Sequence, residues 1–221
     1  MITFDNAGKA FRNRKGDVSW VFRNFSASFV DGVSTGILVP RGQGKTTLID
    51  LAAGNESPSE GHIYRQGRIS WPLGDKSNIS NRLTGKQNLR FLTDVYGRHF
   101  GNAYDFVVEF ADLGRYLDAP IRQYNSEMRA RLSIASLFAM DFNYILVDDS
   151  MDGGDNSFRR KCAQYLAENS DRFTFFMATG NVEMVLKYCQ SAGVLNEGVL
   201  TLYDTVSDAI AEFNKVNQVF V

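Results

Sequence analysis

The chain has 221 residues, of which 44% are hydrophobic, and this is enough to bury the core of one large α/β domain over residues 1–221. Its 24 basic and 25 acidic side chains give a formal charge of −1, so no basic excess suggests nucleic acid, and no such partner is expected. No apolar run approaches the roughly 18 residues that span a bilayer, and the N-terminus lacks the pattern of an export signal. Cys162 and Cys189 are expected to be buried reduced thiols, and together these features predict a cytoplasmic protein.

Short apolar segments in the first part of the chain predict β strands. They lie at residues 1–4, 20–22, 26–29, 33–39, 61–64 and 68–71. A helix is expected at 48–53, directly after the fourth of these strands, and Gly54 should end it.

Helices alone are predicted from about residue 82 to residue 141. Thr84 and Gln87 form a capping box in front of the first, which Gly97 is expected to stop. Further helices are expected at 104–111 and from Asn125 to 138. The region is therefore expected to be an all-helical insert within the single domain.

Strands and helices alternate again after the insert. The predicted strands lie at 144–147, 173–178, 193–195 and 199–202, and the predicted helices at 158–166, 182–189 and 206–213. Strands followed by helices imply an α/β fold with a mainly parallel sheet.

The apolar run 37–39 leads directly into a loop with a lysine and a hydroxyl at the start of a helix. This suits a nucleoside triphosphate with Mg²⁺, because a helix N-terminus offers free N–H groups and a positive dipole end. Lys45 would reach the β and γ phosphate oxygens, and the Thr46 hydroxyl would bind the metal. The residues expected around ATP are Arg41, Gly42, Gln43, Gly44, Lys45, Thr46 and Thr47.

Val39 departs from the P-loop pattern G-x-x-x-x-G-K-[ST], which begins with glycine. A β-branched residue resists positive φ, so two outcomes are open. An extended backbone would preserve binding, whereas a left-handed one would strain the loop by about 1–3 kcal/mol. Pro40 favours the extended form, because the residue before proline is pushed toward β geometry.

A P-loop, a helical insert and a strand that ends in Asp148 and Asp149, in this order, resemble an ABC-type ATPase domain. Four further strings are similar to the ATP-binding subunit of capsular polysaccharide exporters in Gram-negative bacteria: residues 69–73, 83–88, 110–116 and 158–164. The likeness runs through nearly the whole chain. It implies a P-loop NTPase core with N-terminal antiparallel β strands, in which two domains pair head to tail around ATP.

This resemblance implies roles within one nucleotide site. Phe11 would stack on adenine, although a core phenylalanine is the alternative. Asp148 would hold Mg²⁺ together with Thr46, and Asp149 would replace the glutamate that polarises the attacking water, beside Lys45. Its carboxylate is one methylene shorter, and a misplacement of about 1 Å can cost about 10²-fold in rate. Capping of the following turn is the alternative for both acids.

The resemblance also implies contacts to the nucleotide of a partner domain. They are assigned to Asn125, Ser126, Glu127 and Asp155. Glu127 stands where the family has a glycine, and facing a phosphate it would add a repulsion of several kcal/mol. An outward-turned Glu127 would be harmless, and Arg129 and Arg131 could offset its charge.

Two positions lack the family's residue. Ser80 replaces the glutamine that senses Mg²⁺ and the permease, and Gly180 replaces a histidine that contacts the γ-phosphate. The permease is expected to contact residues 77–96, where Phe91 and Tyr96 either line a groove or pack in the core.

The prediction is the ATP-binding subunit of an ABC transporter that exports capsular or other cell-surface polysaccharide, with ATP and Mg²⁺ as cofactors and impaired hydrolysis. It would lie on the cytoplasmic face of the inner membrane, on an ABC-2-type permease, as a homodimer or a heterodimer with another ATPase subunit. A non-hydrolysing structural or regulatory partner of a permease or of an active ATPase is the alternative, and a soluble P-loop kinase is a third possibility.

Overall fold

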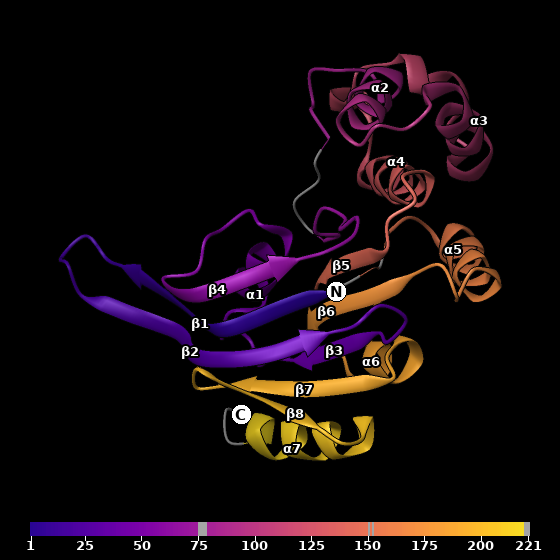
Figure 1. Ribbon diagram of the computed structural model, residues 1–221. Helices are drawn as coiled ribbons and strands as arrows, with labels where there is room; N and C mark the ends of the chain where they lie inside the picture. The colour runs from indigo at the N-terminus through magenta and orange to yellow at the C-terminus, as the bar shows by residue number, and fades with distance from the viewer. Residues whose placement is uncertain (75–78, 150, 152, 219–221) are drawn as a thin grey trace. The chain divides into compact units, whose positions relative to one another are not determined.

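The computed structural model describes residues 1–74, 79–149, 151 and 153–218. The chain forms two compact units, shown in Figure 1. The first comprises residues 1–74, 143–151 and 171–221, and the second comprises 75–142 and 152–170. Within the described residues, no helix is both long and apolar enough to cross a membrane.

The first unit contains a three-stranded antiparallel sheet, in which β1 (Ile2–Arg12) lies between β2 (Val18–Phe29) and β4 (Glu60–Arg65). β1 and β2 are much longer than the short strands predicted there. Their register shifts near Asn6 and Asn24, which adopt positive φ values of 47° and 50°. These irregularities break the alternation of apolar and polar residues. The sequence pattern of each long strand therefore predicts only short separate strands.

A second sheet of the same unit has five strands in the order β5-β6-β3-β7-β8. They are β5 (Tyr144–Asp148), β6 (Thr174–Thr179), β3 (Thr35–Leu38), β7 (Ser191–Asn196) and β8 (Val199–Tyr203). Four are parallel, and β8 pairs antiparallel with β7. The mainly parallel sheet and the final hairpin are therefore confirmed.

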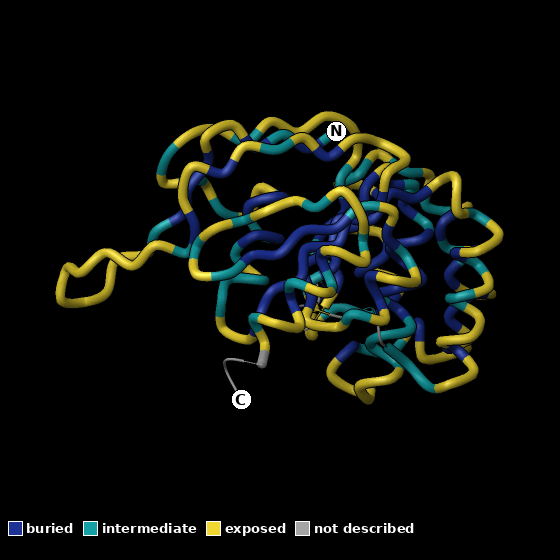
Figure 2. Tube along the Cα trace, turned by 90° about the horizontal axis from the view of Figure 1, so that it is seen from below, coloured by how far each residue is buried: buried dark blue, intermediate teal, exposed yellow. Residues whose placement is uncertain are grey.

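Three helices belong to this unit: α1 (Lys45–Ala53), α6 (Val182–Tyr188) and α7 (Val206–Gln218). The four buried residues of α1 join a cluster with side chains from both sheets, in the dark interior of Figure 2. In this cluster the ring centroids of Phe29 and Phe176 lie 4.6 Å apart. Burial of each large apolar side chain stabilises the fold by about 1.5–3 kcal/mol, so α1 is held firmly against β5 and β6.

The strand predicted at 68–71 is wrong. Ile69 forms only an isolated bridge with Tyr144, and the Leu146 N–H donates to the Ser70 hydroxyl at 2.9 Å. The Leu146 N–H thus donates to a side-chain oxygen, where in a regular sheet it would donate to a backbone carbonyl of the neighbouring strand. Residues 68–71 therefore form no continuous strand pairing with β5.

Within its described residues, the second unit consists of helices joined by loops, with an isolated β-bridge between Thr84 and Pro120. Its helices are α2 (Gly85–Val95), α3 (Phe100–Ala111), α4 (Ser126–Ala139) and α5 (Asn156–Glu168), with short 3-10 turns at Gly114–Asp118 and Ile121–Gln123. The predicted capping box is present, because the Gln87 N–H donates to Thr84 Oγ1 at 3.1 Å and the Thr84 N–H to Gln87 Oε1 at 2.9 Å.

Candidate functional site

The loop between β3 and α1 begins at Val39, at the end of a central strand. Val39 is fully buried, and its N–H donates to the Thr179 carbonyl at 3.0 Å. Its backbone stays outside the positive-φ region, so the strained left-handed alternative is wrong. A valine here adds apolar surface to the core just beyond the end of β3.

Gly44 caps α1 and can be no other residue in this backbone. Its φ is 101°, and an added Cβ would lie 2.2 Å from Val21 Cγ1 of β2. Gly42 also has a positive φ, of 82°. These two glycines allow the chain to turn sharply ahead of the helix.

The start of α1 presents unpaired backbone donors. Within the described residues, the N–H groups of Gly44, Lys45 and Thr46 donate to no protein acceptor. The positive end of the helix dipole lies at the same place, and the first turn carries no acidic residue. This arrangement suits a phosphate group.

Lys45 points its ammonium at the acid that ends β5. Lys45 Nζ lies 2.8 Å from Asp149 Oδ1, and the same oxygen lies 3.5 Å from the Gly180 N–H. Asp149 has a positive φ of 70°, and the Thr179 hydroxyl donates to its carbonyl at 2.7 Å. A protein carboxylate thus neutralises the lysine that was predicted to bind phosphate.

Gly180 lies close to the same lysine, and the space for a side chain is open. Of the part of the chain that the structure describes, an added Cβ would meet only the Val39 carbonyl at 3.7 Å and Lys45 Nζ at 3.9 Å. Both distances are ordinary contacts, so this position could accept a side chain that reaches the nucleotide.

Thr46 and Asp148 are brought together, as predicted for a Mg²⁺ site. Burial raises the pKa of the Asp148 carboxyl, and the hydrogen bond from the Thr46 hydroxyl opposes this rise. The nearby carboxylates of Asp50 and Asp149 raise the pKa further. Hydroxyl and carboxylate oxygens are the ligands that Mg²⁺ prefers, so this pair fits the metal.

Phe11 lies on the long β1–β2 hairpin, whose exposed tip is visible in Figure 2. Its side chain is 46% exposed, so the alternative of a core phenylalanine is wrong. Phe11 pairs with Ser19, two residues from the Val21 that contacts Gly44. Its ring is therefore partly open to a ligand on the strand pair that packs against the P-loop, with Lys9 Nζ 5.0 Å from its centroid.

The other predicted loop residues differ in their surroundings. Arg41 is exposed, and Thr47 is half-buried. Gln43 is already engaged, because the Glu197 N–H donates to its Oε1 at 2.6 Å. This bond anchors the loop to the β7–β8 hairpin.

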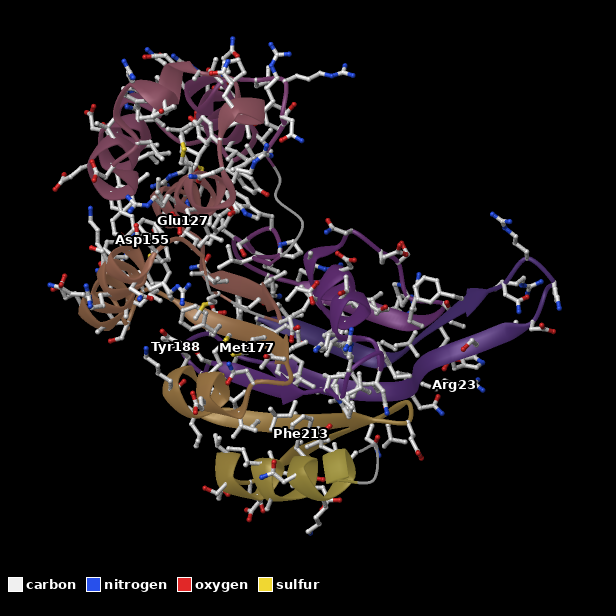
Figure 3. All side chains as sticks on the ribbon, turned by 180° about the vertical axis from the view of Figure 1, so that it is seen from behind. Arg23, Glu127, Asp155, Met177, Tyr188 and Phe213 are labelled. Carbon is white, nitrogen blue, oxygen red and sulfur yellow. The ribbon has the colours of Figure 1, made fainter. Side chains whose placement is uncertain are left out.

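The predicted trans contacts lie in the second unit, where Figure 3 labels Glu127 at the start of α4 and Asp155 at the start of α5. The Asn125 side chain caps α4 by accepting the Met128 N–H at 2.8 Å. Ser126 and Glu127 follow, both exposed in the first turn.

Neither nearby arginine offsets Glu127 in the way that the sequence suggested. Arg129 donates to the Asn81 side chain and to the Tyr124 carbonyl. Arg131 donates to the Asp155 carboxylate and to the Ala111 carbonyl. Both guanidinium groups are therefore used within the second unit.

Asp155 has a structural task at the start of α5. The Phe158 N–H donates to it at 2.9 Å, and this bond, followed by that from Arg131, holds the pKa of Asp155 below its usual value. Arg131 also lies 5.3 Å from the Phe158 ring centroid. Arg131 thus joins the end of α3, the body of α4 and the start of α5.

Replacing Arg131 by methionine should lower the free energy of unfolding, because Asp155 and Ala111 lose a charged donor. The midpoint of thermal unfolding should fall by about 2–6 °C. The difference in unfolding free energy between the variant and the wild type should be full above pH 3.8, the ordinary aspartate pKa. It should shrink as the pH falls from there through the lowered pKa of Asp155 in the folded chain. Arg160→Met, at an exposed position of α5, is the control, and an equal effect of both substitutions would contradict this role.

Sequence reasoning missed the contacts that hold the loop in place. Val21, Thr179 and Glu197 come from strands or turns far from the P-loop in sequence. No local pattern marks them, because their roles depend on which strands become neighbours.

The ABC transporter family model matches residues 22–152. The polysialic acid transport ATP-binding protein KpsT of Escherichia coli is 33% identical over 218 residues, which cover 97% of this chain and 99% of the relative. The capsule polysaccharide export ATP-binding protein CtrD of Neisseria meningitidis serogroup B is also 33% identical, over 98% and 100% of the two chains.

A solved structure of the ATP-binding subunit of an ABC transporter superposes with a TM-score of 0.80 at 15% identity, over 97% of this chain and 99% of that chain. The predicted ABC-type α/β fold and the predicted resemblance are thus confirmed. The chain belongs to the family of ABC transporter ATP-binding proteins that includes these capsule polysaccharide export relatives.

Proposed function

We propose that this chain is the ATP-binding subunit of an exporter of capsular or other cell-surface polysaccharide, acting on the cytoplasmic face of the inner membrane. The names and near-complete coverage of its relatives support the polysaccharide. The observation that best supports nucleotide binding is the set of free N–H groups beside Lys45 at the start of α1. The two units would form one nucleotide-binding domain, with the helical unit as its insert.

ATP would bind with its phosphates against the N–H groups at the start of α1 and with its base against the exposed Phe11 ring. Lys45 would exchange Asp149 for phosphate oxygens. Thr46 and Asp148 would hold Mg²⁺, which when bound would neutralise charge on the phosphates. Stacking of adenine on Phe11 would contribute about 1–3 kcal/mol.

Slow hydrolysis is part of the proposal. The Asp149 side chain is one methylene shorter than that of glutamate. Its backbone is left-handed, and its carboxylate pairs with Lys45. Gly180 has no side chain to contact a phosphate, and the exposed Glu127 brings a negative charge to the proposed trans contact. At the proposed trans contact, Asn125 and Asp155 would act mainly by capping α4 and α5. Ser126 would contribute to the same contact.

The pairing of Lys45 with Asp149 also favours a second candidate function, a subunit that binds nucleotide without turnover. Such a subunit would support a permease or complete the site of an active ATPase in a heterodimer. A phosphate-release assay on the purified chain, alone and with its permease, separates the two functions. Release at a rate of about 1 per second or more, within the usual enzyme range, would contradict impaired hydrolysis.

The partner would be an ABC-2-type permease. The expected contact region begins at Ser77, which lies outside the described residues. Further along, Phe91 is 57% exposed, whereas Tyr96 packs edge-on against Phe142 with centroids 5.0 Å apart. Phe91 is thus available to a partner, and Tyr96 supports the fold. Co-purification with a co-expressed ABC-2-type permease tests the assignment, and Phe91→Ser should reduce the recovered complex.

Replacing Asp148 by asparagine should weaken the Mg²⁺-dependent part of ATP binding by about 10–100-fold, because this carboxylate would orient the metal's ligands. Titrations with and without Mg²⁺ measure this part directly. Binding without Mg²⁺ should change little and serves as the internal control. An unchanged dependence on Mg²⁺ would remove Asp148 from the proposed metal site.

A further inference from the structure

A separate cavity lies in the second unit, between the last turns of α3 and α5. Its volume is about 320 Å³, which is at the lower end of the range for ligand pockets. Three rings and several polar side chains line it, and none of them belongs to the proposed nucleotide site. They are Phe106, Glu109, Phe110, Lys161, Gln164, Tyr165 and Glu168.

The rings form a continuous aromatic surface. The centroids of Phe106 and Phe110 lie 5.2 Å apart with nearly parallel planes, and Tyr165 lies 5.5 Å from Phe106 and 5.3 Å from Phe110. Faces of aromatic rings attract cations through their quadrupole. The cavity already shows this preference, because Lys161 Nζ lies 4.9 Å from the Phe110 centroid.

Lys161 leaves the remaining negative charge uncompensated. Its ammonium donates to the Glu109 and Phe110 carbonyls at 2.8 and 3.0 Å, so it is committed to the end of α3. Among the described residues, the Glu109 carboxylate has no such partner, and Glu168 accepts only from the amide of Gln164, at 2.8 Å.

The end of α5 adds to this field. α5 ends at Glu168 and has no basic residue in its last turn, whereas Lys161 and Arg131 already donate to the last carbonyls of α3. The C-terminal end of a helix carries a partial negative charge that favours cations. Glu168 has the wrong sign for that place, so a cation from outside would satisfy both the carboxylate and the helix end.

We propose that this cavity receives an arginine side chain of a protein partner. A guanidinium is planar and weakly hydrated, so it stacks on aromatic faces while its N–H groups bind carboxylates. Glu109 and Glu168 would accept these bonds, and Phe106 and Tyr165 would cover the plane. This site is independent of the nucleotide site, and its occupation does not depend on the proposed function.

The test is a titration of the full chain with N-acetyl-L-arginine methylamide, followed by NMR chemical shifts. We expect saturable shifts confined to the last turns of α3 and α5. The citrulline analogue has the same shape without the charge, and it should bind at least about tenfold more weakly. Glu109→Gln and Glu168→Gln should each weaken binding of the arginine probe, whereas the exposed Glu183→Gln of α6 should not.

Three outcomes would overturn the proposal. One is the absence of saturable binding to a chain that is folded by its own spectrum. Another is equal binding of the arginine and citrulline probes, or no effect of the double Glu109→Gln, Glu168→Gln variant. The third is tighter binding of free arginine than of the capped probe, which would assign the cavity to a small molecule in place of a protein partner.

Discussion

Replacing Lys45 by alanine should reduce the affinity for ATP by at least about 100-fold. The ammonium would donate charge-assisted hydrogen bonds to two phosphate oxygens, each worth about 1.5–3 kcal/mol, and tenfold corresponds to 1.4 kcal/mol. The basal rate of phosphate release should barely change if it is already low. Calorimetric titration with ATP and Mg²⁺ measures the affinity.

The matched control is Lys215→Ala, because this lysine is 72% exposed and, among the described residues, pairs only with Glu212. It removes the same charge far from α1 along the chain and should leave the affinity unchanged. Circular dichroism should confirm that both variants remain folded. Equal affinities for the Lys45 variant and the wild type would mean that nucleotide binds elsewhere or not at all.

Restoring two family residues, with Glu127→Gly and Gly180→His, should tighten ATP-driven dimerisation by at least about tenfold. Glu127 would face a phosphate across a cleft, where repulsion between like charges costs several kcal/mol. A histidine at 180 would add a donor, and the structure leaves room for its Cβ. Sedimentation with a saturating non-hydrolysable ATP analogue measures the dimer fraction.

Glu127→Gln separates charge from helix propensity in this experiment. A glycine near the start of α4 costs up to about 1 kcal/mol of helix stability, whereas glutamine keeps the propensity of glutamate. If charge limits closure, Glu127→Gln alone should raise the dimer fraction. A double variant with the dimer fraction of the wild type would show that neither residue limits closure.

Most elements of the fold could be predicted because each carries a local signal. The capping box at Thr84 and Gln87 marked the start of α2, and the buried run 144–147 marked β5. The strand at 68–71 was wrong because a local pattern cannot show that the Ser70 hydroxyl replaces a ladder carbonyl. The lengths of β1 and β2 were hidden by asparagines in left-handed conformations within the strands.

The parts of the candidate site that follow a local sequence motif could be predicted. The parts that depend on contacts between residues distant in the sequence could not. Thr46 and Asp148 meet as expected, because parallel strands bring their ends to one edge of the sheet. The pairing of Lys45 with Asp149 was not foreseen, since the sequence alone assigned each a partner on the nucleotide. Arg131 was assigned to Glu127 by proximity along the chain, but its length allows it to reach Asp155.

The most direct test of nucleotide binding at the β3–α1 loop is isothermal titration of the folded wild-type chain with ATP and Mg²⁺. We expect one saturable site per chain, and chelation of Mg²⁺ should weaken it. ADP should bind more weakly, because Lys45 would lose its contact with the γ-phosphate. No heat of binding with ATP, ADP or a non-cleavable analogue would contradict nucleotide binding by this chain.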